Sequence, residues 1–164
     1  MKNEKSRDQK SKTATGSGRD SSDTPVLECE RVVSTPTRHV LLIEDDPVIL
    51  ELLQDVLSAA GFRVLIAKTA ADGLELFQEF SESTFCIILD YGIPGMHASR
   101  LLERLVDVDE EVKVILSSGY PQNFVGEDFP LDRCAGFMAK PYDPQILISE
   151  LERLRTIEAE AVSR

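Results

Sequence analysis

Short apolar runs alternate with helix-like patterns along the chain from His39 onward. The first run, Val40–Ile43, is continuous and aliphatic, as expected of a strand that is buried on both faces. Four further runs that are mostly apolar occupy residues 62–67, 85–89, 112–116 and 135–139. Because the runs alternate with helical segments, the pattern predicts an α/β fold with a doubly wound parallel sheet of five strands.

The segments between the runs carry helix start signals and apolar stripes. Asp46 followed by Pro47 predicts that the first helix begins here, because aspartate caps a helix N-terminus and proline fits the first turn. Thr69 with Asp72 resembles a capping pair for the second helix. Residues 120–132 contain two prolines and a glycine, so any helix there should be short. The positions expected to face the core are Leu50, Leu53, Val56 and Leu57 in the first helix, Leu101, Leu102, Leu105 and Val106 in the third, and Ile146, Leu147, Leu151 and Leu154 in the last.

The beginning of the chain differs in composition from the rest. Residues 1–37 are rich in Lys, Ser, Thr, Asp and Gly and show no sustained apolar period. Such a segment cannot bury enough surface to offset the entropy of ordering. We therefore expect a disordered N-terminal tail over 1–37 and one globular domain over 38–158. Residues 159–164 are expected to form a C-terminal helical extension or tail.

The formal net charge of −11 is concentrated in the globular part. Residues 1–37 hold seven Lys/Arg and six Asp/Glu, whereas residues 38–164 hold the other eleven and twenty-three. A domain this acidic repels nucleic acid phosphates, so direct binding of DNA or RNA is not expected. No run reaches the roughly 18 apolar residues of a membrane helix, so a membrane partner is not expected either.

The cysteines and the N-terminus predict a cytoplasmic protein. Cys29, Cys86 and Cys134 have no metal-like spacing, and their odd number does not suit a disulfide framework. The charged segment Met1–Lys12 lacks the apolar region of a signal peptide. Both features favour a reducing compartment. Cys86 falls inside an apolar run and is most simply a small core residue.

Polar residues follow four of the predicted strands at the point where each strand ends. They are Glu44 and Asp45 after the first, Asp90 after the third, Ser117 after the fourth and Lys140 after the fifth. The carboxyl ends of parallel strands share one edge of the sheet, so these residues should meet in one crevice. Three carboxylates packed together repel one another unless a cation intervenes, and Mg²⁺ suits such oxygen ligands.

This inventory suits transfer of a phosphoryl group onto an aspartate. The carboxylate of Asp90, followed by a Gly/Pro loop, can act as a nucleophile toward phosphorus. Lys140 can pair with Asp90 and with phosphoryl oxygens, while Ser117 offers a hydroxyl to the same oxygens. Taken singly, a strand-terminal aspartate is more often a cap or turn residue, and Asp46 is most simply a helix cap. The Lys140-Pro141 bond is a candidate for the cis form, which would aim the lysine inward.

The chain from about 38 to 157 resembles the receiver domain of response regulators in two-component signalling. The matching stretches are 40–47 (VLLIEDDP), 88–96 (ILDYGIPGM), 114–120 (VILSSGY) and 137–142 (FMAKPY). Together they cover the whole predicted globular part. The resemblance implies a flavodoxin-like fold. The motifs of the chain also resemble those of the receivers attached to hybrid sensor kinases.

The resemblance implies a role for each residue of the strand-end set. Asp90 would be the phosphoacceptor, taking its phosphoryl group from the phosphohistidine of a histidine kinase. Lys140 and Ser117 would hold the phosphoryl group, and Ser117 with Phe137 would form the switch that reports phosphorylation. The implied Mg²⁺ ligands are Glu44, Asp45, Asp90 and the backbone carbonyl of Gly92. Ser117 replaces the more usual threonine and Glu44 the more frequent aspartate, and both retain the required functional group.

The implied partners are proteins. They are a sensor histidine kinase or phosphotransfer protein upstream and a protein effector downstream, with a phosphorylation-dependent homodimer as a further arrangement. We expect no output domain on this polypeptide and no enzyme activity beyond the domain's own phosphorylation and dephosphorylation. Two alternatives differ in class. A phosphatase of the haloacid-dehalogenase type would require a second acid at position 92, which is Gly92. A receiver-like adaptor that works without phosphorylation usually loses the acceptor aspartate or the lysine, and both are present.

Overall fold

Five parallel strands form one sheet in the order β2-β1-β3-β4-β5. The computed structural model describes residues 38–141 and 143–162, so the tail expected over 1–37 lies outside the described residues. The strands are β1 (His39–Ile43), β2 (Arg63–Ala67), β3 (Thr84–Asp90), β4 (Val114–Ser118) and β5 (Gly136–Ala139). The helices are α1 (Pro47–Ala59), α2 (Ala70–Phe80), α3 (Ala98–Val108), α4 (Gln122–Asp128) and α5 (Pro144–Val162), with short 3₁₀ turns at Ser81–Ser83 and Leu131–Arg133.

The strand order confirms the doubly wound sheet. The chain runs from β1 outward to β2, then returns to β3 on the other side of β1 and continues outward to β5. In open sheets of this kind, ligands bind outside the carboxyl ends of the strands where the order reverses, which here is between β1 and β3. The ends of these strands lie side by side. Ile43 on β1 pairs with Leu89 on β3, and Asp90 on β3 pairs with Ser117 on β4. Residues far apart in the sequence are therefore brought to one edge.

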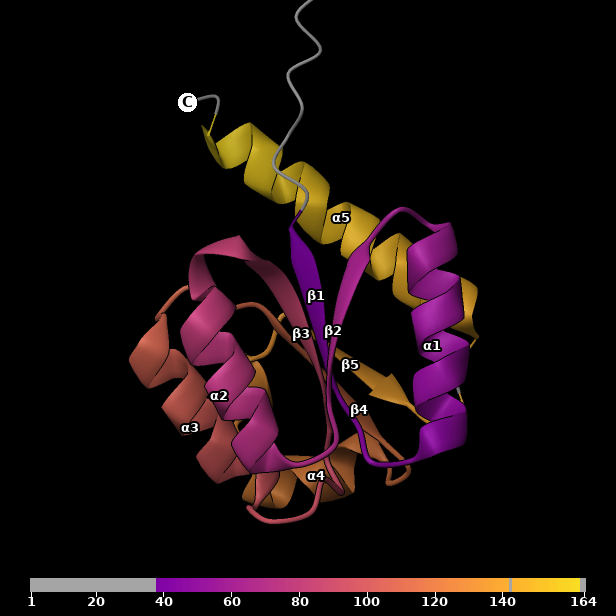
Figure 1. The fold of residues 1–164 in the computed structure, drawn as a ribbon. Helices are drawn as coiled ribbons and strands as arrows, with labels where there is room; N and C mark the ends of the chain where they lie inside the picture. Colours follow the sequence, from indigo (N-terminus) through magenta and orange to yellow (C-terminus); the bar gives the residue numbers. More distant parts are fainter. Residues whose placement is uncertain (1–37, 142, 163–164) are drawn as a thin grey trace, which may run out of the picture. The chain divides into compact units, whose positions relative to one another are not determined.

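Helices cover both faces of the sheet. In Figure 1, α1 and α5 lie on one side of the strands, and α2 and α3 lie on the other. A hydrophobic core lies on each face of the sheet, and alternate residues of β1 point into one or the other. Leu41 and Ile43 pack with α2 and α3, while Val40 and Leu42 pack with α1 and α5. All four are completely buried, which explains why the strand carries no polar alternation.

The expected core stripes are largely confirmed, with one error. Leu147, Leu151 and Leu154 of α5 are buried as predicted, but Ile146 is 61% exposed. Residue 146 lies in the first turn of α5, about 100° around the helix from Leu147. The stripe formed by positions 147, 151 and 154 already faces the sheet, so its neighbour at 146 points to solvent.

The predicted helix starts are confirmed. Asp46 caps α1, because its side chain accepts hydrogen bonds from the backbone N–H groups of Val48 (2.8 Å) and Ile49 (3.3 Å). Thr69 Oγ1 accepts from Asp72 N at 3.1 Å and caps α2. By contrast, α4 has seven residues and no side-chain cap, in agreement with the prolines that flank it.

The cysteines and the C-terminal helix also bear on the sequence predictions. Cys86 is buried on β3 and Cys134 is partly buried. α5 continues as one helix through position 158 to Val162. Within the described ranges, none of the helices combines the length and the apolar character that crossing a membrane requires.

Candidate functional site

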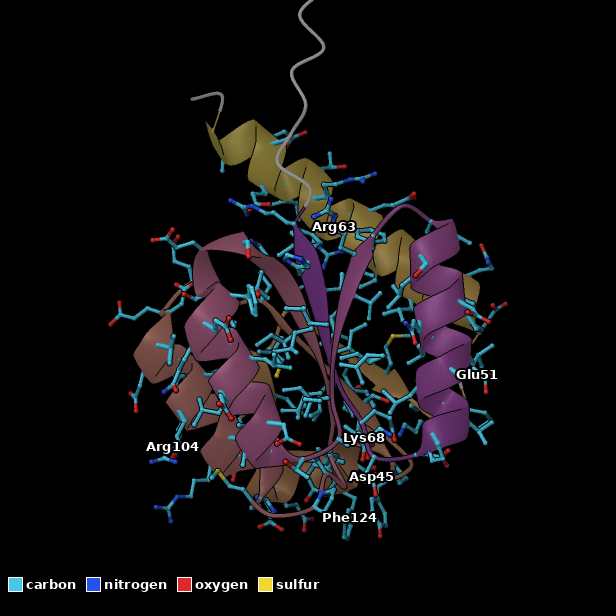
Figure 2. The ribbon with its side chains drawn as sticks, in the orientation of Figure 1. Asp45, Glu51, Arg63, Lys68, Arg104 and Phe124 are labelled. Atoms are coloured by element: carbon cyan, nitrogen blue, oxygen red, sulfur yellow. The ribbon has the colours of Figure 1, made fainter. Side chains whose placement is uncertain are left out.

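Three carboxylates meet at the carboxyl edge of the sheet. Glu44 and Asp45 directly follow β1, and Asp90 is the last residue of β3. One oxygen from each of the three lies within 4.8 Å of the others. Glu44 and Asp90 are buried, whereas Asp45 is exposed. Figure 2 shows Asp45 and Phe124 in the lower part of the molecule, and Arg63, at the start of β2, toward the opposite end of the strands.

Lys140 joins two of these carboxylates. Its ammonium donates hydrogen bonds to Glu44 Oε2 at 2.6 Å and to Asp90 Oδ1 at 2.8 Å. The lysine directly follows β5, and its backbone N–H donates to the carbonyl of Ser118 on β4 at 2.7 Å. The Lys140-Pro141 peptide bond, which the sequence offered only as a candidate for the cis form, is cis. The positive charge therefore sits between two buried acids that are 46 residues apart in the sequence.

The paired charges shift the titration of both partners. Burial raises the pKa of the Glu44 carboxyl above its usual value, and the neighbouring Asp90 charge acts in the same direction. The hydrogen bond from Lys140 opposes this shift without cancelling it. Burial by itself would lower the pKa of the Lys140 ammonium, but its hydrogen bonds to Asp90 and Glu44 outweigh burial and raise the pKa overall. The lysine is therefore firmly cationic beside an acid that resists ionisation.

Ser117 places an unpaired hydroxyl beside the acids. It faces Asp90 across the β3–β4 register and is 1% exposed. Its Oγ is the buried side-chain N or O atom for which no hydrogen-bond partner is found within the described residues. A buried polar atom without a partner costs stability, so such atoms frequently mark a position where a ligand supplies the missing bond.

The two remaining predicted residues lie close to this edge. Phe137 is on β5, in register with Leu116 of β4, and is partly buried against the core beneath α2 and α3. Gly92 is exposed in the loop after β3, and a Cβ added there would lie 3.1 Å from Asp90 Oδ2. At Gly119, an added Cβ would meet no atom within 4 Å. The approach to Asp90 is therefore unobstructed by side chains at these two positions.

The residues that flank Asp90 and Ser117 make contacts that the sequence did not predict. The backbone N–H of Tyr91 donates to the carbonyl of Ser117 at 2.8 Å. Ser118 Oγ accepts from the backbone N–H of Tyr120 at 3.0 Å. The signal that could have drawn attention to them is an aromatic residue shortly after each of two adjacent strand ends. The first bond joins the loop after β3 to β4, and the second holds the start of the loop after β4.

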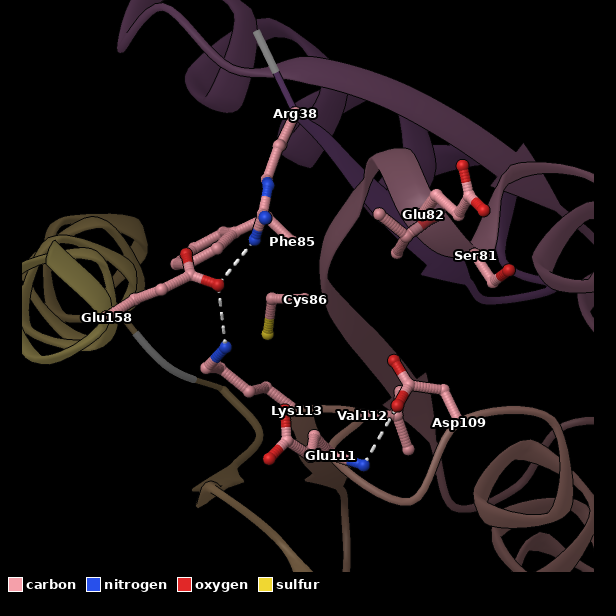
Figure 3. A pocket seen from close by; sticks show the side chains of 11 residues that line it. Arg38, Ser81, Glu82, Phe85, Cys86, Asp109, Glu111, Val112, Lys113 and Glu158 are labelled. Carbon is pink, nitrogen blue, oxygen red and sulfur yellow. Dashed lines mark hydrogen bonds and ion pairs between the residues drawn. The ribbon is translucent and has the colours of Figure 1, made fainter. Parts of the chain in front are cut away.

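A separate hollow of about 150 Å³ lies at the opposite end of the strands. In Figure 3, the carboxylate of Glu158 on α5 faces the cationic groups of Arg38 and Lys113, and one oxygen pairs with both. Glu111 donates its backbone N–H to Asp109 at 2.9 Å on the same rim. These polar groups are already paired with one another. The chemistry predicted from the sequence is therefore not located in this hollow.

The donor set at the carboxyl edge fits a hard divalent cation. Two of its three clustered carboxylates are buried, and Lys140 compensates only part of their negative charge. Oxygen ligands of this kind suit Mg²⁺, which binds one or two carboxylates and keeps several waters. The exposed position of Asp45 leaves one side of the cluster open for those waters.

The chain matches the family model described as the response regulator receiver domain over residues 40–152. It is 26% identical over 117 residues to the response regulator receiver protein CpdR of Brucella abortus, covering 71% of this chain and 96% of CpdR. It is also 26% identical over 137 residues to the sensor kinase CckA of the same organism. That match covers 80% of this chain but only 14% of CckA.

The fold leads to the same family. A CheY-like response regulator receiver domain protein from Methanospirillum hungatei superposes with a TM-score of 0.67 at 27% identity. The match covers 75% of this chain and 98% of that protein. The sheet order, the acidic cluster with its lysine and the family match over 113 consecutive residues, 40–152, all agree. This chain belongs to the response regulator receiver domain family of two-component signalling.

Proposed function

We propose that Asp90 accepts a phosphoryl group from a phosphohistidine and that the resulting aspartyl phosphate switches a partner-binding surface. An Asp90 oxygen attacks phosphorus, a P–O bond forms, and the P–N bond to the donor imidazole breaks. Lys140 already binds Oδ1, so we assign Oδ2 as the attacking oxygen. The donor histidine leaves with the electron pair of the broken bond and takes up a proton.

The observation that carries this proposal is that the two polar side chains beside Asp90 differ in their hydrogen bonding. Lys140 Nζ donates to Glu44 Oε2 at 2.6 Å and to Asp90 Oδ1 at 2.8 Å, whereas the buried Ser117 hydroxyl has no partner in the described structure. A phosphoryl group on Asp90 would offer oxygens to both. The ammonium stabilises negative charge as it develops, and the hydroxyl gains the hydrogen bond that it lacks. A purely structural cluster would not explain the orphaned hydroxyl.

Mg²⁺ is the cofactor that this set would hold. We assign Glu44, Asp45, Asp90 and the backbone carbonyl of Gly92 as its ligands. When bound, the ion would offset the carboxylate charge and polarise the phosphoryl oxygens. The chain's own contribution is to present two buried acids on rigid strand ends and to exclude other side chains from the approach.

The switch residues that we propose are Ser117 and Phe137. Movement of the Ser117 hydroxyl toward the phosphoryl group would vacate space beside β4. Phe137, which is partly buried on the neighbouring strand, would rotate into that space. A local charge change would thus be read out by a packing change.

The implied partners are a sensor histidine kinase or phosphotransfer protein as donor and a protein effector as target. A phosphorylation-dependent homodimer is the further arrangement to test. We assign residues 38–158 as the receiver unit, which encloses the matched residues 40–152. Its setting is cytoplasmic in this proposal, and its chemistry is limited to its own phosphorylation and dephosphorylation.

Incubation with Mg²⁺ and acetyl phosphate, followed by intact mass measurement, tests the proposal. The protein should gain one phosphoryl group, and chelation of Mg²⁺ should prevent the gain. Asp90→Asn should abolish it, while Asp107→Asn, an exposed aspartate on α3, should not. Labelling that persists in Asp90→Asn would place the acceptor elsewhere. If neither acetyl phosphate nor a phosphorylated donor protein labels the unaltered chain, the adaptor function replaces this proposal.

A further inference from the structure

Four aromatic rings form a continuous series beside the phosphoacceptor. The ring of Tyr91 contacts that of Phe129 at 6.3 Å and that of Tyr120 at 6.1 Å, in both cases edge to face. Tyr120 in turn contacts Phe124 at 5.2 Å. We call Phe129, Tyr91, Tyr120 and Phe124 the aromatic ladder. His97 adds an edge contact to Tyr91 at 5.8 Å.

The ladder runs from the core to the surface. Phe129 is 3% exposed, whereas Tyr120 and Phe124 are 55% and 50% exposed. The buried end is ordinary packing and by itself implies nothing more. The outer end is different, because two large rings remain half in water while they contact each other. Their arrangement depends on the residues beneath them, and Tyr91 is the ring that links them to the core.

Two hydrogen-bonded links connect the ladder to the candidate site. Tyr91 directly follows Asp90, and its backbone N–H donates to the Ser117 carbonyl at 2.8 Å. On the neighbouring strand, the Ser118 hydroxyl accepts from the backbone N–H of Tyr120 at 3.0 Å. The two links converge where the Tyr91 and Tyr120 rings meet. A shift of either strand end therefore acts on the same ring contact.

The helix at the outer end is weakly held. α4 is seven residues long and has no side-chain N-cap. Val125 is the buried residue within it, and Phe124 points outward. An element with few buried contacts opens or shifts at low cost. The Tyr120–Phe124 pair is thus connected to the site by the hydrogen bond from Tyr120 to Ser118 and by the ring contact with Tyr91. Phe124 itself lies on a short helix with one buried residue.

We propose that Tyr91 is a positioning residue that transmits the state of Asp90 to the exposed Tyr120–Phe124 pair through its ring contact with Tyr120. This inference rests on the proposed function. It adds a route to the switch at Ser117 and Phe137, on the opposite side of β4 from β5. When the phosphoryl group forms, the ends of β3 and β4 adjust, the two rings move together, and the surface presented by α4 changes.

Hydrogen exchange of the full chain tests the relay. Amide exchange is followed by mass spectrometry in residues 119–129, with and without Mg²⁺ and beryllofluoride as the phosphoryl mimic. Tyr91→Phe keeps the ring, Tyr91→Leu removes it, and Tyr120→Leu removes the other half of the contact. Phosphoryl uptake from acetyl phosphate is measured on each by intact mass. Exchange in residues 136–140 monitors the route through Phe137 in the same samples.

The unaltered protein and Tyr91→Phe should both change exchange in 119–129 when beryllofluoride is added. Tyr91→Leu and Tyr120→Leu should lose that change while residues 136–140 still respond. A response in 119–129 that survives both leucine variants would overturn the relay. If Tyr91→Leu takes up no phosphoryl group, Tyr120→Leu decides by the same criterion.

The two proposals fail in different ways. An unaltered protein that is labelled on Asp90 but shows no exchange change in 119–129 overturns the relay alone. An unaltered protein that cannot be labelled by any donor overturns the proposed function. The relay is then overturned as well, because Asp90 carries no phosphoryl group whose presence could be transmitted.

Discussion

At the scale of the residue, the buried and unpaired hydroxyl of Ser117 should cost stability. Ser117→Ala removes a buried polar atom that has no partner, so the unphosphorylated protein should become more stable by about 1–3 kcal/mol. The same change should slow phosphoryl uptake, because the hydrogen bond to the phosphoryl group is lost. Urea unfolding measures the first effect, and the rate of labelling by acetyl phosphate measures the second.

Ser118 is the matched control for this experiment. It is equally buried on the same strand, but its Oγ accepts a hydrogen bond from the backbone N–H of Tyr120. Ser118→Ala should therefore destabilise the protein by about 0.5–1.5 kcal/mol. Equal effects of the two alanine variants on stability would contradict the assignment of Ser117 as the unpaired hydroxyl.

Glu44 should make stability depend on pH when Mg²⁺ is absent. Burial raises the pKa of its carboxyl in the folded state above the ordinary value of 4.5. The folded state thus binds the proton more tightly, and this contribution to stability is complete below pH 4.5 and is lost as pH rises through the folded pKa. Glu44→Gln keeps an acceptor for Lys140 without the charge. It should be more stable than the unaltered protein at pH 7, and the difference should shrink at acidic pH.

Thermal unfolding at several pH values, with a chelator present, measures this difference. Glu111→Gln, an exposed acid at the opposite end of the strands, provides the control and should show no such trend. A Glu44→Gln variant that is less stable at pH 7 would mean that the attraction between Glu44 and Lys140 outweighs the cost of burying the carboxylate.

At the scale of the element, α2 approaches β1 closely at Gly73. A Cβ added at Gly73 would lie 2.6 Å from Cδ1 and 3.1 Å from Cγ1 of Ile43, which is completely buried. Gly73→Ala should therefore destabilise the protein by about 1–2 kcal/mol, because overpacking outweighs the better helix propensity of alanine. Gly126→Ala in α4 is the control. Its Cβ would meet Leu131 Cδ1 at an ordinary 3.4 Å, so stability should stay equal or rise slightly. Urea unfolding of both variants distinguishes close packing from a general effect of replacing glycine.

Elements were predictable where local chemistry decides them. The apolar runs predicted five strands because helices cover both faces of the sheet. Asp46 and Thr69 marked helix starts because their side chains satisfy free N–H groups. Ile146 was wrongly placed in the core. Its periodic position was one of two that could face the sheet, and only the packing of α5 decides between them.

At the scale of the whole molecule, cation binding should stabilise the folded state. The carboxylates that we assign to Mg²⁺ come from β1 and β3 and are far apart in the unfolded chain. A ligand that binds only the folded state at 100 times its dissociation constant adds about 2.7 kcal/mol of stability. Addition of MgCl₂ should thus raise the unfolding temperature, and Asp45→Asn should reduce the shift, whereas Asp107→Asn should not. Equal shifts in both variants would show that the ion acts elsewhere.

The sequence by itself determined the α/β class, the parallel sheet and the set of residues that meet at its edge. It could do so because strands of a doubly wound sheet all end on one side, so polar residues at successive strand ends must converge. Only the tertiary structure decided how they are paired. Lys140 bridges Glu44 and Asp90, Ser117 is left without a partner, and Tyr91 joins the site to an exposed aromatic surface. Those contacts depend on strand register and side-chain packing between segments up to 96 residues apart, which no local pattern encodes.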